Sequence, residues 1–289
     1  MVDSEPPVAP GAPGPSGGAA DAPGGERPRY SIVIPIHNEA ECLADEVAEL
    51  VDELDACRVN YEIILAENGS ADNCLEIAEA CASANPRIRA LRLPDPDYGA
   101  AMKAGMLAGR GDLIVNFDID FHDVDFMLQA GDLVAGSAPA QAGDLVAGGL
   151  AAPSPLGAGG TAAPGVVVGS KLVEGAEDRR SPARHIVSLG FTTILRLLFD
   201  RHMDDTHGMK VLRREVVERF APQTVMTRDL FDTELIIRAR RGGVKVKALP
   251  VMVEEKRKPR SSIVRRIPRT IKGLLKLRLV LWKEGNARS

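Results

Sequence analysis

The sequence predicts an α/β fold: one domain built on a mostly parallel β-sheet with helices on both faces. Two observations lead to this prediction. Short runs of β-branched and aliphatic residues alternate along the chain with segments of helical periodicity. Acids and amides directly follow several of these runs, and in open parallel sheets the carboxyl ends of the strands form the ligand-binding edge.

Predicted strands and helices follow one another in order. Runs rich in β-branched residues predict strands at residues 30–36, 61–66, 88–93, 113–117 and 166–169, and a late edge strand at 244–253. Apolar residues at helical spacing predict helices over residues 39–54 and 100–108. We expect a further helix that begins at Ser70, as its N-cap, and ends near Cys81.

Composition narrows the class of protein. The chain has 289 residues, 45% of them hydrophobic, so it is long enough to bury a large core. We find no run of about 18 uncharged apolar residues and no signal-peptide core, which predicts a cytoplasmic protein without a membrane span. The four cysteines show no CxxC pair or zinc-site spacing, which favours reduced thiols over a disulfide framework.

Two low-complexity segments stand apart from the predicted domain at residues 30–255. Residues 1–29 hold seven Pro and six Gly and few large apolar side chains, which predicts a disordered arm. Residues 130–165 contain no Lys or Arg, and 20 of the 36 are Ala or Gly. We expect an expanded surface loop there, with a helix in part of it as the alternative.

Polar side chains follow three of the predicted strands. They are Asn38 and Glu39 after the first strand, Glu67 and Asn68 after the second, and Asp118 and Asp120 after the fourth. Strand ends that share one edge predict a single crevice. Two carboxylates spaced by one residue can reach one cation, and hard oxygen ligands favour Mg²⁺ or Mn²⁺. His122 lies two residues further on, and an imidazole shifts the preference toward Mn²⁺.

These motifs occur in the order found in family-2 glycosyltransferases with the GT-A fold, and the sequence resembles that family. Residues 34–39 (IPIHNE) resemble its PxYNE motif, 67–72 (ENGSAD) its DDGSxD, 97–105 its glycine-rich NxGxxxAxxxG, and 118–120 its DxD. Residues 168–171 (VGSK), 204–210 (DDTHGMK) and 257–262 resemble the VGSR, DPTSGFK and RxxGxS motifs of the dolichyl-phosphate mannosyltransferase subgroup. The resemblance covers about residues 30–265.

The resemblance implies a role for each matching residue. Pro35, His37 and Glu39 would line the nucleotide pocket, Glu67 would accept a hydrogen bond from the base, and Arg257 would contact the diphosphate. Asp118, Asp120 and His122 would hold the metal. Lys171, Arg184 and Ser188 would bind the acceptor phosphate, and Arg184 and Ser188 share one face of a predicted helix. The departures from the family pattern are Glu67-Asn68 for Asp-Asp, His122 for Gln, Lys171 for Arg, Asp205 for Pro and Arg260 for Gly.

Two acidic positions have structural alternatives. Glu39 is a nucleotide-site candidate or a cap of the following helix. The acids of residues 227–234 are either a solvated helix start or part of the site, where Asp229 would act as a base toward a hydroxyl acceptor. A phosphate acceptor needs no base, because its second pKa of about 6 leaves it ionised at pH 7.

The C-terminal segment, residues 256–289, is strongly basic, with twelve Lys or Arg and one acid. We predict a helix that starts near Pro268, with one apolar side (Ile263, Ile267, Ile271, Leu274, Leu275, Leu281) and basic residues opposite. Such a helix packs on the domain, lies on an anionic membrane, or does both. Nucleic acid is not expected as a partner, because the basic residues lack aromatic interleaving and a binding motif.

The predicted function is therefore a metal-dependent, inverting transfer of a hexose from GDP-mannose or a UDP-hexose to a polyprenyl phosphate. The protein would lie in the cytoplasm, peripheral to the membrane. One alternative is a family-2 enzyme with a hydroxyl acceptor and Asp229 as base. The other is a non-catalytic nucleotide-binding scaffold, suggested by the Glu67-Asn68 and His122 departures.

Overall fold

A computed structural model of the chain describes residues 26–136, 163–171, 173–174, 176–178, 182–201, 203, 206, 208–253 and 263–286. Most of the predicted arm, the middle of the predicted insertion, and the segment with Arg257 and Arg260 lie outside the described residues. So do His207 and the Asp204-Asp205 pair.

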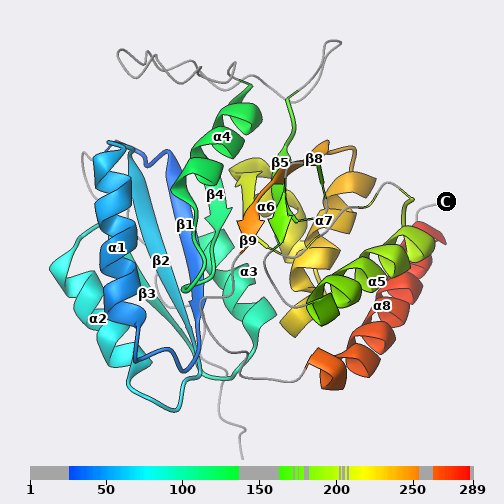
Figure 1. The fold of residues 1–289 in the computed structure, drawn as a ribbon, viewed down its shortest axis with the longest axis horizontal. Helices are drawn as coiled ribbons and strands as arrows, with labels where there is room; N and C mark the ends of the chain where they lie inside the picture. Colours follow the sequence, from blue (N-terminus) through cyan, green and yellow to red (C-terminus); the bar gives the residue numbers. More distant parts are fainter. Residues whose placement is uncertain are drawn as a thin grey trace, which may run out of the picture.

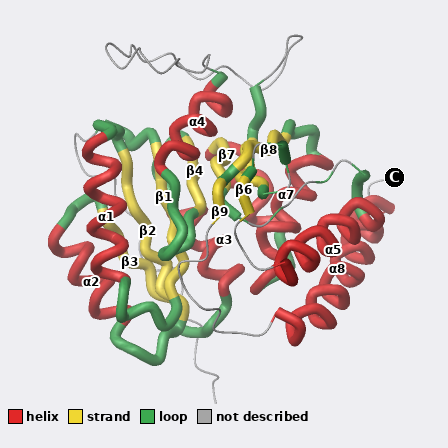
Figure 2. The backbone as a smooth tube through the Cα atoms, in the orientation of Figure 1, coloured by secondary structure: helices red, strands yellow, loops and turns green. Residues whose placement is uncertain are grey.

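The centre of the described chain is a seven-stranded sheet in the order β3-β2-β1-β4-β7-β5-β8 (Figures 1 and 2). Its strands are β1 (Tyr30–Ile36), β2 (Tyr61–Asn68), β3 (Ile88–Leu93), β4 (Leu113–Asn116), β5 (Val166–Ser170), β7 (Lys210–Arg213) and β8 (Val246–Pro250). Neighbours pair in parallel except around β7, which runs antiparallel to both β4 and β5. A small second sheet pairs β6 (Glu177–Asp178) with β9 (Met252–Val253). The mostly parallel α/β sheet predicted from the sequence is confirmed.

Helices cover both faces of the sheet and bury two separate cores. They are α1 (Leu43–Ala56), α2 (Cys74–Ala84), α3 (Tyr98–Ala108), α4 (Val124–Ala135), α5 (Pro182–Leu198), α6 (Arg214–Phe220), α7 (Phe231–Arg241) and α8 (Ile263–Asn286), with 3₁₀ turns η1 (Ala221–Gln223) and η2 (Arg228–Leu230). Because side chains alternate along a strand, Ile32 and Ile34 of β1 join the core under α1, α2 and α4, while Val33 joins the core under α3, α6, α7 and α8.

Several predicted element boundaries differ from the structure. Helix α2 begins at Cys74 with Asn73 as its N-cap, so the prediction that Ser70 caps it is wrong. The Ser70 hydroxyl accepts a hydrogen bond from the Asn38 amide instead. Helix α4 extends to Ala135, so the start of the predicted loop insertion is helical, and the helix ends at Gly136 in the left-handed region (φ 78°).

Helix α8 packs against the core that contains α7 through one row of leucines. Leu274, Leu277 and Leu281 are buried in the core shared with α7, and Arg238 binds Glu284 at 2.8 and 3.0 Å. The helix begins five residues before Pro268, so this proline lies in the second turn and not at the predicted start. Within the described parts of the chain, no helix combines the length and apolarity that crossing a membrane requires.

Candidate active site

Three strand ends carrying polar residues lie at one edge of the sheet. Strand β1 pairs in parallel with β2 on one side and β4 on the other, so the segments that follow them are neighbours. Ile36 lies beside Glu67, and Val33 beside Asn116. The predicted grouping of residues 37–39, 67–70 and 117–120 at the carboxyl edge is therefore present.

Hydrogen bonds hold the loops after β1 and β2 together. His37 Nδ1 donates to the Asn68 carbonyl at 2.7 Å, which leaves Nε2 to accept from Asn38 Nδ2 at 3.0 Å. Asn38 adopts a left-handed φ of 56°, and its side-chain oxygen accepts from the Ala71 amide. Glu67 is 2% exposed and accepts from the Ser70 amide at 2.6 Å. Glu67 thus fixes its own turn at the edge of the predicted nucleotide pocket.

Glu39 does not cap helix α1 with its side chain. The N-cap is Cys42, and no side-chain hydrogen bond caps the helix. The Glu39 carbonyl accepts from the amides of Cys42 and Leu43, and its own amide donates to Cys74 Sγ at 2.9 Å. The hydrogen bonds of Glu39 therefore exclude the capping alternative for its side chain. Pro35, another residue of the predicted nucleotide pocket, is half-buried in β1 beside Ala66.

Asp97 connects the start of α3 to the segment before α7. Its Oδ1 accepts from the amide of Ala100 at 3.0 Å, capping α3, and from the amide of Arg228 at 2.8 Å. Burial alone would raise the pKa of Asp97, but these two backbone hydrogen bonds, together with a hydrogen bond from Thr227 and the charge of Arg228, hold the pKa below its ordinary value. Gly99 allows the close approach, since a Cβ there would lie 2.6 Å from the Arg228 nitrogen. The segment that contains Asp229 is therefore anchored at the carboxyl edge.

Asp118 and Asp120 lie in a tight turn after β4. Two backbone hydrogen bonds close the turn: the Phe121 amide donates to the Asp118 carbonyl at 3.1 Å, and the Asp118 amide donates to the Phe121 carbonyl at 3.3 Å. Asp118 is exposed to solvent at this turn. Desolvation by the neighbouring groups is the largest cause that raises the pKa of Asp118 to about 6; Lys210 and Lys171 oppose the rise, and Asp120 and Asp232 add to it.

A buried lysine faces these carboxylates. Lys210 of β7 is fully buried, and its ammonium donates to Asn116 Oδ1 at 3.1 Å and to the Gly208 carbonyl at 2.6 Å. It lies 3.3 Å from Asp232 Oδ1, although that oxygen receives no well-aligned hydrogen bond. The Tyr98 hydroxyl donates to Asp232 Oδ2 at 3.1 Å, and burial raises the pKa of Tyr98 well above its ordinary value.

Lys210, Asp232 and Tyr98 were not predicted as site residues. Tyr98 and Lys210 lie inside two of the matched motifs, at residues 97–105 and 204–210, and that position was the available signal. Asp232 and Glu234 are buried, so the solvated-helix-start alternative is wrong for both. The side chain of Asp229 lies outside the described residues.

The carboxylates at this edge fit a hard divalent cation. Asp118 interacts electrostatically with Asp120 and with Asp232, and one oxygen of Asp232 is buried without a hydrogen bond. Lys210 lies 3.3 Å from Asp232, and both Lys210 and Lys171 act on Asp118. Because oxygen ligands of this kind bind Mg²⁺ or Mn²⁺, the donor set matches the predicted metal.

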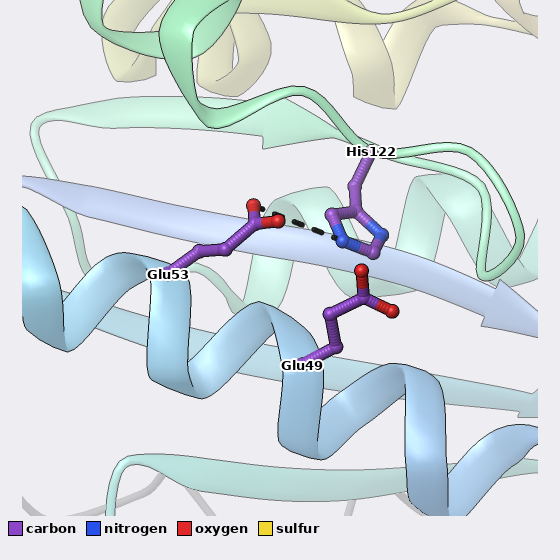
Figure 3. A group of neighbouring side chains, drawn as sticks. All are labelled: Glu49, Glu53 and His122. Carbon is purple, nitrogen blue, oxygen red and sulfur yellow. Dashed lines mark ion pairs between the residues drawn. The ribbon is translucent and has the colours of Figure 1, made fainter.

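His122 lies apart from the two aspartates of the predicted ligand set. Its side chain, 4% exposed, turns toward α1, where Nε2 lies 3.9 Å from Glu53 Oε2 (Figure 3). Among the described residues, the group whose ligand atoms converge within 4.8 Å is Glu49, Glu53 and His122, and not Asp118, Asp120 and His122. The imidazole packs near the Phe117 ring, with centroids 6.3 Å apart. The geometry leaves Asp118 and Asp120 as the predicted metal ligands.

The predicted acceptor residues are only partly described. Lys171 follows β5 and lies close enough to Asp118 to lower its pKa, so it shares the carboxyl edge with the aspartates. Ser188 is half-buried on α5. Arg184 lies on the same helix, one turn earlier, and its side chain is outside the described residues.

Comparison with known proteins finds similarity to glycosyltransferases. Residues 31–124 match the family "Glycosyl transferase family 2". The chain is 28% identical over 237 residues to a dolichyl-phosphate beta-glucosyltransferase of Trichomonas vaginalis, covering 76% of this chain and 62% of that protein. It is 28% identical over 253 residues to Glycosyltransferase AglD of Haloferax volcanii, covering 86% of this chain and 36% of the relative. The chain thus spans less than two thirds of the length of these relatives.

Solved structures share the fold at low sequence identity. Glucosyl-3-phosphoglycerate synthase of Mycobacterium tuberculosis, crystallised with Mn²⁺ and UDP, superposes with a TM-score of 0.57 at 17% identity, covering 87% of this chain and 80% of that one. Mannosyl-3-phosphoglycerate synthase of Rubrobacter xylanophilus gives 0.55 at 16% identity, covering 89% and 75%. These structures show that the chain has a GT-A-like fold, and within that fold residues 31–124 match the glycosyl transferase family 2.

Proposed function

We propose that the protein is a divalent-metal-dependent, inverting glycosyltransferase that moves a hexose from a nucleotide diphosphate sugar to a polyprenyl phosphate. The observation that carries the proposal is the Asp118–Asp120 turn at the carboxyl edge of a family-2 domain. The relatives support the acceptor class, since their names include a dolichyl-phosphate beta-glucosyltransferase and an undecaprenyl-phosphate sugar transferase.

Each residue at the edge has a defined task in this proposal. Asp118 and Asp120 would hold Mg²⁺ or Mn²⁺, which when bound neutralises charge on the departing diphosphate. Pro35, His37, Glu39 and Glu67 would line the nucleotide pocket, and Arg257 would contact the diphosphate. Lys171, Arg184 and Ser188 would orient the acceptor phosphate, which attacks the anomeric carbon as an anion and needs no base.

A UDP-hexose is the donor we favour over GDP-mannose. Two relatives are named as glucosyltransferases, and a structure with the same fold holds UDP. The substitution of Glu67-Asn68 for the family's Asp-Asp falls at the predicted base contact. We therefore place UDP-glucose first in a donor screen, followed by GDP-mannose.

A groove beside the carboxyl edge suits an isoprenoid chain. It has a volume of about 550 Å³ and lies between residues 225–230 and helix α8. Its lining includes Val225, Leu275 and Leu279, with Arg228, Arg269, Lys272 and Lys276 among its basic residues. The apolar side chains would contact the hydrocarbon chain of such a lipid, and the basic side chains would bind its terminal phosphate. A larger cavity, of about 720 Å³, is lined by α7, β8 and the end of α5, and none of the predicted site residues lines it.

The outer face of α8 supports an anionic membrane as the surface on which the acceptor is reached. Large apolar side chains are exposed there: Ile267, Ile271, Leu275, Leu279 and Trp282. Basic residues of the same helix flank them, including Lys272 and Lys276. An exposed apolar stripe with adjacent cations is typical of a helix that lies in a headgroup region.

The test is nucleotide release measured with each donor and each acceptor class in the presence of Mg²⁺ or Mn²⁺. The proposal predicts release from UDP-glucose or GDP-mannose only when a polyprenyl phosphate is added, and equal rates in the parent and in Asp229→Asn. Release that depends on a hydroxyl acceptor and is lost in Asp229→Asn would support the hydroxyl-acceptor alternative. Donor binding without turnover on any acceptor would support a scaffold.

A further inference from the structure

A second group of metal-ligand side chains lies outside the proposed catalytic site. Glu49 and Glu53 are one turn apart on the exposed face of α1, and His122 comes from the loop between β4 and α4 (Figure 3). One ligand atom from each of the three lies within 4.8 Å of the other two. The group joins two segments that are 69 residues or more apart in the sequence.

The surroundings of the His122 imidazole indicate a ligand between these three side chains. The side chain is 4% exposed, and among the described residues neither ring nitrogen makes a hydrogen bond. Its nearest charged atom, Glu53 Oε2, is 3.9 Å from Nε2, which is too long for a hydrogen bond. The ligand atoms of the imidazole and the two carboxylates converge without a hydrogen bond between His122 and Glu53, a spacing that leaves room for a cation.

The spacing of the carboxylates supports the same conclusion. Glu49 and Glu53 are at i and i+4, so their like charges face each other on one side of the helix and repel. A cation held by both would remove this repulsion. The Phe117 ring beside His122 restricts the imidazole, and both glutamate side chains are exposed and free to adjust.

The donor set defines the class of metal. One imidazole and two carboxylates suit a first-row transition ion such as Zn²⁺ better than Mg²⁺, which prefers oxygen ligands and water. Zinc holds nitrogen and oxygen ligands at about 2.0–2.2 Å, which places tetrahedral ligand atoms about 3.4 Å apart. A small rotation of the exposed glutamates therefore closes the group around an ion.

We propose that Glu49, Glu53 and His122 form a Zn²⁺-class site that fastens the loop after β4 to helix α1. His122 lies two residues after Asp120, so an ion bound here would limit the movement of the turn that carries Asp118 and Asp120. The site would be structural or regulatory, and it is separate from the Mg²⁺ or Mn²⁺ of the proposed reaction. The proposal does not depend on any donor or acceptor.

The test is a titration of tag-free, full-length protein with Co²⁺, in excess Mg²⁺ that keeps the aspartate site filled. The expected result is one equivalent of Co²⁺ with visible d–d absorption that Zn²⁺ displaces. His122→Gln, Glu53→Gln and Glu49→Gln should each weaken binding by about 100-fold or more, because even an indirect metal contact is worth about 10- to 100-fold. The two glutamate variants change exposed side chains, so they are expected to fold.

Asp52→Asn is the matched control, since it removes the same charge from an exposed position of the same helix. It should bind Co²⁺ as the parent does. The proposal is overturned if no Co²⁺ binds, if the three variants bind like the control, or if a thiolate charge-transfer band assigns the ion to cysteine.

Discussion

Lys210 is the buried positive charge around which the acids of the site are arranged. Its ammonium lies 3.3 Å from Asp232 and lowers the pKa of Asp118, while Asn116 and the Gly208 carbonyl accept its hydrogen bonds. A buried charge without a partner is far more costly than a neutral pair of the same shape. Lys210 therefore both pairs with the buried Asp232 and lowers the pKa of Asp118 in the turn after β4.

Removal of this charge should destabilise the fold unless its partner is also neutralised. We expect Lys210→Met to lower the free energy of unfolding by about 3–5 kcal/mol, because Asp232 is left buried and unpaired. The double variant Lys210→Met with Asp232→Asn should recover part of that loss, with a coupling of about 0.5–3 kcal/mol. Urea unfolding of the parent, of Lys210→Met, of Asp232→Asn and of the double variant gives this coupling energy. Additive effects of the two changes would contradict the ion pair.

At the scale of single residues, the sequence predicts the motif acids but not their partners. Asp118 and Asp120 were recognised because a DxD after an apolar strand is a local pattern. Lys210 and Asp232 meet only because β7 inserts between β4 and β5 with α7 packed against the sheet, a contact over distant segments that no spacing rule contains. His122 follows Asp120 by two residues, yet the tight turn directs its side chain to α1.

Among the elements, Glu62 on β2 connects four segments at the amino end of the sheet. Its carboxylate accepts from Ser31 Oγ and from the Arg110 amide, both at 2.6 Å, and pairs with Arg89 and Arg110 at 2.9 Å. Burial alone would raise the pKa of Glu62, but these hydrogen bonds and charges lower it below its ordinary value of 4.5. The network orders β1, β2, β3 and the loop before β4 on the side opposite the site.

This network should make stability depend on pH in a defined direction. Because the folded-state pKa is lowered, Glu62 stabilises the fold above pH 4.5, and the contribution is lost as the pH falls through the folded-state value. We expect Glu62→Gln to cost about 3 kcal/mol at neutral pH and progressively less in acid. Urea unfolding at several pH values checks this, and a pH-independent difference between the two proteins would contradict it.

The alternation of strands and helices could be predicted from the sequence, but the residues at which elements begin and end were predicted less accurately. Continuous apolar runs predicted β1, β2, β3, β4, β5 and β8, since a strand buried on both faces has no polar alternation to obscure it. Strand β7, which begins at the buried Lys210, was not predicted. The Ser70 cap failed because that hydroxyl bonds to Asn38 from another strand end. The predicted apolar side of α8 divides in two: Leu274 and Leu281 are buried, while Ile267, Ile271 and Leu275 face outward. Tertiary packing decided each of these cases.

For the whole molecule, the charge is unevenly distributed between an acidic domain and a basic C-terminal segment. Residues 256–289 carry twelve Lys or Arg and one acid, although the whole chain has a net charge of −4. Figure 1 places α8 at the end of the molecule away from α1 and α2. On the proposed membrane-bound function, a surface that is basic and apolar at one end would give the domain a preferred orientation on an anionic membrane.

This orientation is testable with vesicles. Lys272→Gln with Lys276→Gln should weaken binding to phosphatidylserine vesicles about 30-fold, because each basic residue near the surface contributes about 1 kcal/mol. Lys245→Gln with Lys247→Gln, at exposed positions in and just before β8, removes the same charge outside α8 and serves as the control. Co-sedimentation gives both affinities. Equal losses in the two double variants would contradict a role for α8 and indicate a general effect of net charge.

The central claim, metal-dependent transfer to a lipid phosphate, is tested most directly by formation of a lipid-linked sugar. Radiolabelled UDP-glucose or GDP-mannose is incubated with polyprenyl phosphate, and label in the organic phase is counted for the parent and for Asp118→Asn, with and without a chelator. We expect label from one donor in the parent with Mg²⁺ or Mn²⁺, and a loss of about 100-fold or more in Asp118→Asn or after chelation. Transfer that persists at the parent rate without Asp118 and without metal would contradict the account.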